Sequence, residues 1–277
     1  MMRGLLIAAM MFGAVSAVRA ADMPDLPILR GGFSEGLTSS RVNWQGYYIG
    51  GQAGYGSSDE NFTRSPSTAP LLKALLANTI IENEMGVSSW PVNFGKVSRR
   101  SSGWGAFGGY NSQWEDVVIG VEASYLHGGF GGSYPVSVHR VQTLSDLYIH
   151  DVTSTSTSAI SITDMATLRV RGGYAYGCFL PYLFGGVALG NADITRTATV
   201  LDVMTPGPTN PPGRRPAFWS AMEAQHNHLI YGYSAGLGVD VNLIGGLFLR
   251  AEWEYIRFTA SVDTNINTVR AGLGYKF

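Results

Sequence analysis

Apolar and polar residues alternate along several stretches of the chain, most regularly over residues 265–277. Val269, Ala271, Leu273, Tyr275 and Phe277 form one row at a period of two. The positions between them are polar or glycine. This period predicts a β-strand with one apolar and one polar face. The aromatic residues of the row favour a strand that ends at a membrane interface.

The same alternation predicts seven further strands. Their ranges are 46–57, 102–113, 117–126, 162–176, 180–191, 228–241 and 246–258. Both rows of 180–191 contain apolar residues, so the pattern leaves the facing of this strand open. Strands of ten to fifteen residues are long enough to cross the hydrocarbon of a membrane when they tilt.

The connections between these strands alternate in length. Long ones cover 58–100, 127–160 and 192–227, whereas tight turns lie at 113–116, 177–178 and 242–245. Long loops outside and tight turns in the periplasm are typical of outer-membrane barrels. The pattern therefore predicts an all-β fold, an eight-stranded antiparallel transmembrane β-barrel with both termini in the periplasm. Within the first connection, 71–85 has helical spacing after Pro70, and the sequence leaves open whether a helix forms.

The first twenty residues predict a secretory signal peptide. Arg3 precedes an uncharged apolar run, and Val18-Arg19-Ala20 offers compact residues for cleavage. The alternative is a transmembrane helix, but the run is well short of the roughly 20 residues that a span needs. We expect a signal peptide at 1–20, a Pro- and Gly-containing periplasmic lead-in at 21–45, and the barrel at 46–277.

The polar rows of the predicted strands carry charges that would point into the barrel. They are Glu122, Arg169, Arg171, Arg250, Glu252, Glu254 and Arg270. The interior of an eight-stranded barrel is just wide enough for side chains to fill it, and buried charges persist when they are paired. These residues therefore predict an ion-paired, plugged lumen. The alternative for each charge alone is a solvated surface position.

Several segments resemble the small outer-membrane β-barrel (porin-family) proteins, the surface antigens of alphaproteobacterial type. The residues that carry the resemblance are Trp44–Gly56, Gly108–Asn111, Pro181–Leu183 and Val269–Phe277. The long connections depart from it in length and content. The resemblance implies an outer-membrane location, an eight-stranded barrel, and recognition of Leu273, Tyr275 and Phe277 by the barrel assembly machinery. It supplies no catalytic residues, and haem binding, known for some relatives, falls on no residue here.

Composition narrows the function classes further. Glycine makes up 36 of 277 residues, about 13% against a usual ~7%, which suits crowded β-structure. Without the signal peptide, 17 Lys and Arg (19 less Arg3 and Arg19) face 20 Asp and Glu, a net charge of about −3. This balance argues against nucleic acid as a partner. The lone Cys178 rules out an internal disulfide.

Short motifs that match cofactor-binding or catalytic signatures lack the structural context that those signatures need. Gly103–Gly108 matches G-x-G-x-x-G and Gly232–Gly236 matches G-x-S-x-G, but both lie inside predicted strands with no helix after them. His226 and His228 lack two further metal ligands at a suitable spacing. We therefore expect no cofactor and no metal.

An enzyme has to be weighed all the same, because lipid-modifying barrels exist. Ser124, His127 and Glu122 are the nearest grouping of a nucleophile and a base, and nothing in the sequence orients them. We expect a non-enzymatic outer-membrane barrel with a structural or surface-interaction role. Its partners would be membrane lipids, the assembly machinery and an unidentified external ligand of the long connections. A small diffusion porin is the alternative, and a haem-binding or lipid-modifying barrel comes after it.

Overall fold

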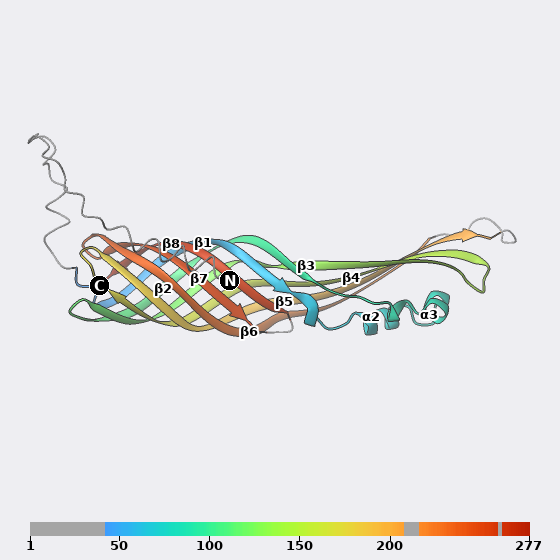
Figure 1. Cartoon of the computed structure of the whole chain (residues 1–277), viewed down its shortest axis with the longest axis horizontal. Coiled ribbons are helices and arrows are strands. Elements are labelled where there is room, and N and C mark those ends of the chain that lie inside the picture. Colours follow the sequence, from blue (N-terminus) through green and yellow to red (C-terminus); the bar gives the residue numbers. More distant parts are fainter. Residues whose placement is uncertain (1–41, 208–215, 260–261) are drawn as a thin grey trace, which may run out of the picture. The chain divides into compact units, whose positions relative to one another are not determined.

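The computed structural model describes residues 42–207, 216–259 and 262–277. The expected signal peptide, 1–20, and most of the lead-in, 21–45, lie outside these residues. Within them, eight antiparallel strands form a closed barrel in sequence order, and the last strand pairs with the first (Figure 1). The strands are β1 (Gly46–Asn61), β2 (Lys96–Trp114), β3 (Val117–Thr143), β4 (Tyr148–Tyr174), β5 (Phe179–Pro206), β6 (Ala217–Ile244), β7 (Leu247–Phe258) and β8 (Asp263–Lys276). The predicted fold class is confirmed.

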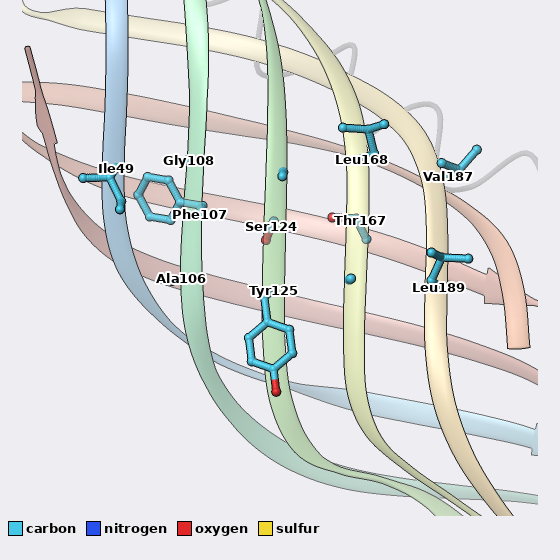
Figure 2. A pocket seen from close by; sticks show the side chains of 12 residues that line it. Ile49, Ala106, Phe107, Gly108, Ser124, Tyr125, Thr167, Leu168, Val187 and Leu189 are labelled. Carbon is cyan, nitrogen blue, oxygen red and sulfur yellow. The ribbon is translucent and has the colours of Figure 1, made fainter. Parts of the chain in front are cut away.

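The two faces of the barrel wall follow the alternation of the sequence. Apolar residues of one row lie on the outside, including Ile49, Leu168, Leu249 and Val269, each at least 47% exposed. Figure 2 shows part of this outer face across β1 to β5. On β5, whose facing the sequence left open, Leu183 is outside at 66% exposure and Tyr182 is inside at 4%.

Three tight turns close one end of the barrel wall. They join β2 to β3, β4 to β5, and β6 to β7. Each needs a residue in the left-handed region: Glu115 at φ 54°, Gly177 at φ 58° and Gly245 at φ 57°. Glycine adopts this conformation without a Cβ clash. The turns lie where the sequence predicts them.

The second and third long connections are largely strand, which corrects the prediction of loops over 127–160 and 192–227. β3 and β4 remain paired up to Thr143 and Ile149, and β5 and β6 remain paired up to Asp202 and Ala217. The prediction failed because each row of these extensions mixes polar and apolar residues, which hides the period of two. Their threonines nevertheless favour strand, since a β-branched side chain is stiff at χ1.

Bulges mark the level at which β3 to β6 leave the closed barrel. The register shifts between His127 and Phe130, between Ile162 and Asp164, and between Ala192 and Ile194. At the same level β2 stops pairing with β3, and β7 stops pairing with β6. A bulge bends a strand and strengthens its twist, which allows four strands to continue as an open sheet.

The first long connection holds two short helices instead of one helix over 71–85. α2 (Ala69–Leu75) begins with Pro70 in its first turn, as its sequence predicts, and α3 (Ile80–Met85) follows a break with Asn78 at φ 66°. Thr79 caps α3 by accepting a hydrogen bond from the Glu82 backbone N–H at 3.3 Å. The two helices and the 3-10 turns η1 (Phe62–Arg64) and η2 (Val87–Ser89) complete the connection.

The helices pack on the extended sheet through an apolar cluster. It joins residues of 72–90 to residues of β3, β4, β5 and β6, and its buried members are Leu72, Leu76, Ile81, Met85, Val87, Trp90, Leu144, Val152, Ala198 and Val200. Two serines of β4 add hydrogen bonds to the same connection: Ser156 with Thr68 and Ser158 with Ser65, both at 2.7 Å. Buried hydroxyls with partners carry little desolvation cost. The sheet extension and the first connection therefore form one packed unit.

Candidate functional site

Charged side chains from β3, β4, β6, β7 and β8 meet inside the barrel. All seven predicted interior charges are at most 3% exposed: Glu122, Arg169, Arg171, Arg250, Glu252, Glu254 and Arg270. The strand register places Glu122 opposite Arg169 and Glu252 opposite Arg270. Strands that are neighbours in the wall thus deliver opposite charges to the same level of the lumen.

Glu122 is the centre of this charged layer. Its carboxylate accepts hydrogen bonds from Arg169 Nε at 2.8 Å, from Arg250 Nη1 at 2.7 Å and from Arg171 Nη1 at 3.3 Å. The Tyr48 hydroxyl donates to the same group at 2.7 Å. Three guanidinium groups around one carboxylate would be unfavourable alone, so further acids must balance the layer.

Asp240 on β6 supplies part of that balance, and the predicted network lacks it. Its carboxylate accepts two hydrogen bonds from Arg250, at 2.8 and 3.0 Å, and one from Arg171 Nη2 at 2.6 Å. With Asp240 the layer has four acids and four arginines, where the sequence prediction counted three and four. The signal was present, because Asp240 shares the inner row of its strand with Gly236 and Gly238.

The remaining acids tie the layer to the last strand. Glu252 accepts from Arg169 Nη2 at 2.7 and 2.8 Å and from the Tyr182 hydroxyl at 2.5 Å. Glu254 pairs with Arg270 and lies 3.5 Å from Arg169 Nη1. Arg169 therefore contacts three of the four acids, and Arg270 pairs with Glu254 rather than Glu252.

Aromatic rings fill the lumen around the guanidinium groups. Arg169 lies over Phe184 at 4.0 Å, Arg171 over Tyr182 at 3.8 Å and Arg250 over Phe107 at 3.9 Å. Such contacts are attractive, and most strongly where water is excluded. Trp44, from the end of the expected lead-in, is 2% exposed and packs edge-on against Phe248. The barrel packing thus begins before residue 46.

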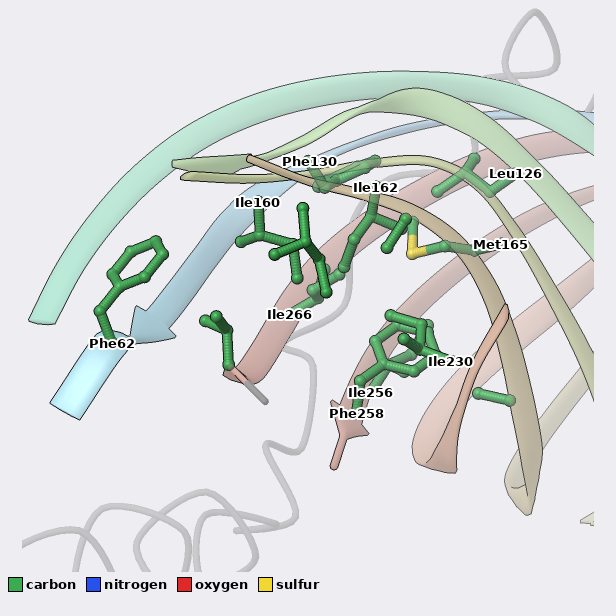
Figure 3. Packing of buried hydrophobic residues seen from close by; sticks show 14 of the residues in the cluster. Phe62, Leu126, Phe130, Ile160, Ile162, Met165, Ile230, Ile256, Phe258 and Ile266 are labelled. Carbon is green, nitrogen blue, oxygen red and sulfur yellow. The ribbon is translucent and has the colours of Figure 1, made fainter. Parts of the chain in front are cut away.

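An apolar cluster occupies the interior on the side of the sheet extension. It is lined from six strands and the first connection, and its larger members include Phe62, Leu126, Phe130, Ile160, Ile162, Met165, Ile230, Ile256, Phe258 and Ile266. Figure 3 shows these side chains directed toward one another between the strands. Phe130, Ile162 and Phe258 are 0% exposed. The lumen is therefore stacked in layers: aromatic, charged, then apolar.

The three candidate catalytic residues, Ser124, His127 and Glu122, do not come together in one site. Ser124 points inward, where Gln52 Nε2 donates to its hydroxyl at 2.8 Å, and Glu122 is held by arginines. His127 points outward and pairs with Asp164 at 2.8 Å. Side chains at odd and even positions of a strand lie on opposite faces, so Ser124 and His127 are separated by the barrel wall. Within 42–207, 216–259 and 262–277, no three His, Cys, Asp or Glu are grouped to hold a metal.

Of the three residues expected to guide assembly, Leu273 and Tyr275 lie on the outer face of β8, and Phe277 follows its last residue. Leu273, Tyr275 and Phe277 are 50%, 49% and 74% exposed. The backbone N–H of Phe277 donates to Tyr47 O at 2.9 Å, across the seam between β8 and β1. Among the described residues, no helix has both the length and the apolar character for a membrane span.

Comparisons with known proteins give a matching family and several similar solved structures. A family model described as outer membrane protein beta-barrel domain matches residues 6–277. Among solved structures, Neisserial surface protein A (NspA) is 14% identical, with 83% of this chain and 97% of that chain covered and a TM-score of 0.36. Ail, the attachment invasion locus protein of Yersinia pestis, is 14% identical over 84% and 100%, with a TM-score of 0.32.

The N-terminal barrel domain of Pseudomonas aeruginosa OprF is also similar, with 13% identity over 83% of this chain and 98% of that chain and a TM-score of 0.29. No curated protein matches the chain.

Proposed function

Because the chain belongs to the outer membrane protein beta-barrel domain family, and is thus a protein of the cell outer membrane, we propose that its barrel is a closed anchor with a structural or surface-interaction role. The observation that carries the proposal is the filled lumen. Eight charged side chains pair with one another, and aromatic rings stack on them. On the side of the sheet extension, an apolar cluster fills the next layer of the lumen. A diffusion channel needs a continuous wet path, which these layers interrupt.

The interacting part would be the extension of β3 to β6 with the helices packed on it. It projects past the apolar belt of the wall, and its outer face carries exposed Leu201 and Phe218, which are partners in the β5–β6 pairing, and Met222 on the same row of β6. Exposed apolar residues gathered on a surface often mark an interaction site. We propose that this part meets an external partner, in the manner of the alphaproteobacterial surface proteins that the strands resemble.

Conductance in planar lipid bilayers tests the closed-anchor proposal. We expect the refolded protein to show no steady single-channel current at moderate voltage, while a general porin in the same bilayers conducts. Refolding is checked by heat-modifiable gel mobility, so that a silent bilayer cannot reflect an unfolded sample. Reproducible, ohmic current from folded wild-type protein would reject the closed anchor and favour the diffusion porin.

The remaining alternatives have no specific support in the described residues. A lipid-modifying barrel would need a nucleophile with its base, and Ser124 and His127 lie on opposite faces of the wall. Haem binding falls on no particular residue. Insertion would depend on membrane lipids and the barrel assembly machinery, which we propose recognises the outer row of β8.

A further inference from the structure

The extension of β3 to β6 is an open sheet with two edge strands (Figure 1). Beyond Gly128, β3 pairs only with β4, and over 217–225 β6 pairs only with β5. Among the described residues, no further strand covers either edge. An edge strand presents a row of backbone N–H and C=O groups, which is a template for another extended chain. The chemistry of such an edge therefore selects an extended peptide as its ligand.

The pairing of β5 with β6 decides which backbone groups of β6 reach the free edge. The Asn242 N–H donates to Cys178 O, so even-numbered residues of β5 point their N–H and C=O at β6, because bonded and non-bonded pairs alternate in an antiparallel ladder. The bulge after Ala192 adds a residue to β6 only, so Trp219 and Ala221 lie opposite even positions and point at β5. The residues that alternate with them point outward: Phe218, Ser220, Met222 and Ala224.

The two edges differ in how well they are protected. On β3, Pro135 has no N–H to donate, and Arg140 adds a charge to the same strand. Proline and charged side chains on an edge strand hinder pairing with another chain. The stretch 217–225 of β6 has no proline and no basic residue, and its one acid, Glu223, pairs with Arg196 on β5 at 2.7 Å. The open edge is therefore the one on β6.

The side chains beside this edge select the peptide further. Phe218 and Met222 are 65% and 67% exposed on the outer face, so every second side chain of an added strand would lie beside them. On the other face, Trp219 packs against the apolar cluster that contains Leu72 of α2. The four residues that point outward carry no charge. The edge thus suits a peptide with apolar residues at alternate positions and little charge.

A second copy of the chain fits this edge less well than a peptide does. All copies cross the membrane in the same orientation, so the β6 strands of two copies run in the same direction. They could meet only as a parallel pair, which is slightly less stable per residue than an antiparallel one. The β3 edge of a neighbouring copy runs antiparallel to β6, but Pro135 interrupts it. A peptide that is not anchored in the membrane can pair in either direction.

We propose that β6 binds an extended, largely uncharged peptide segment of an external protein over 217–225, as a fifth strand of the extension. The peptide exchanges backbone hydrogen bonds with the four outward-pointing residues, and its apolar side chains lie beside Phe218 and Met222. The bulge at Asn227, with φ at 55°, ends the binding edge, because a bulge disrupts regular pairing. The inference rests on the proposed surface interaction and names the class of its partner.

Peptide selection against the folded protein in lipid nanodiscs tests the proposal. The probe is a phage library of random peptides that are long enough to span 217–225, and the selected sequences are then synthesised. They should carry apolar residues at alternate positions and bind the wild type. Methylation of the peptide nitrogens that face β6 removes hydrogen-bond donors and leaves the side chains in place. It should weaken binding by at least about tenfold.

Two matched variants locate the edge. Ser137 and Ser220 lie at the two ends of one cross-strand row, with Thr155 and Thr199 between them. Thr155 points at β5, so Ser137 points outward on β3 as Ser220 does on β6. Both Ser137→Pro and Ser220→Pro should fold, because neither N–H bonds to a neighbouring strand. Ser220→Pro should weaken peptide binding by at least about tenfold, whereas Ser137→Pro should leave it unchanged.

Amide hydrogen exchange of the wild type separates the edge from the face of the sheet. Bound peptide should slow exchange at Ser220 and Met222, while Ala221, whose N–H already points at β5, changes little. If Ser220→Pro fails to fold, this exchange and the methylated peptides decide alone.

Three results would overturn the proposal. One is a library that yields no peptide able to bind the folded wild type. Another is binding that Phe218→Ser abolishes but Ser220→Pro and methylation leave unchanged. That result would place the partner on the outer face, which keeps the proposed surface interaction and rejects the edge. The third is a wild-type dimer that Ser220→Pro converts to a monomer, because the edge would then belong to a second copy of the chain.

Discussion

At the scale of single residues, the interior of the barrel is governed by charge pairing under near-complete burial. Arg250 and Glu254 are 1% and 0% exposed, and both have partners of opposite charge. Removing one member of a buried pair leaves an uncompensated charge, whereas removing both can be nearly neutral. The pairing pattern therefore predicts which double substitutions rescue each other.

Arg270→Ala should destabilise the folded barrel by about 3–5 kcal/mol, because it removes the guanidinium that pairs with Glu254 and leaves that carboxylate only Arg169, 3.5 Å away. Adding Glu254→Ala should recover part of this loss, and that non-additivity identifies the pair. Adding Glu252→Ala instead serves as the control, since Glu252 is bonded to Arg169. Urea unfolding in lipid vesicles gives the free energies. Additive effects in both double variants would contradict the assigned pairing.

Glu60 gives the residue-scale prediction on pH. It lies beyond the apolar outer row of β1, which ends at Tyr55, and it is 1% exposed. Burial, the largest cause, raises the pKa of Glu60 from 4.5 to about 7. In this range the folded protein holds a proton that the unfolded chain releases, so the free energy of unfolding should fall as the pH rises from about 4.5 to 7.

Glu60→Gln should flatten that dependence, because the amide does not titrate. The check is urea unfolding at pH 5, 6, 7 and 8 for the wild type and the variant, with Glu223→Gln, an exposed carboxylate on β6, as the control. The same slope in the wild type and in Glu60→Gln would show that another group is responsible.

At the scale of the elements, the row of the strand on which a residue lies, outer or inner, decides which substitutions it tolerates. Outer positions contact hydrocarbon and inner positions contact a filled lumen, so neighbouring residues of one strand obey opposite rules. The extension adds a third environment, in which Ser156, which the sequence placed in a loop, is buried and bonded to Thr68.

Leu249→Arg places a charge on the outer row of β7 and should cost ~2–4 kcal/mol if the position lies near the bilayer midplane. Ser220→Arg, at an exposed position of the β6 extension, should cost little. Gly238→Arg should fail by crowding instead, because even a Cβ would meet Tyr182 at 2.7 Å and Glu252 at 2.8 Å. The measurement is unfolding of all three in vesicles. Equal tolerance of arginine at Leu249 and Ser220 would mean that the two faces are reversed.

At the scale of the whole barrel, closure depends on the seam between β8 and β1. The two strands are paired from Tyr48 with Lys276 to Asn61 with Asp263. Closure leaves no edge of the wall with unpaired backbone groups toward the lipid, which is why a barrel can span a membrane. Phe277 adds a backbone hydrogen bond to Tyr47 and an edge-on ring contact with Tyr275 at 5.3 Å.

Deleting Phe277 should lower the yield of folded protein in the outer membrane, because the seam loses its terminal bond and β8 loses its last outer aromatic. Heat-modifiable gel mobility of outer-membrane fractions measures the folded share. Phe277→Tyr is the matched control and should fold as the wild type does. An unchanged yield after deletion would remove Phe277 from any role in assembly.

The sequence by itself determined the strands of the barrel wall, the three tight turns and the inward direction of the seven charges. A wall between lipid and a narrow interior imposes a period of two, and that period is visible in each strand of the wall except 180–191, whose facing needed the structure. The inward position of Asp240 could be predicted in the same way, because Asp240 lies on the polar row of its strand.

Only the tertiary structure decided which buried residues pair and what structure the long connections adopt. Glu122 meets Arg250 across 128 positions of the chain, and Tyr182 meets Glu252 across 70. The strands of the extension were hidden because each of their rows mixes polar and apolar residues. Their inner face becomes buried only when α2 and α3 pack on it. The alternation within one strand reflects only the environment of that strand. The pairing of strands, their register and the packing of helices on the extended sheet depend on segments far apart in the sequence.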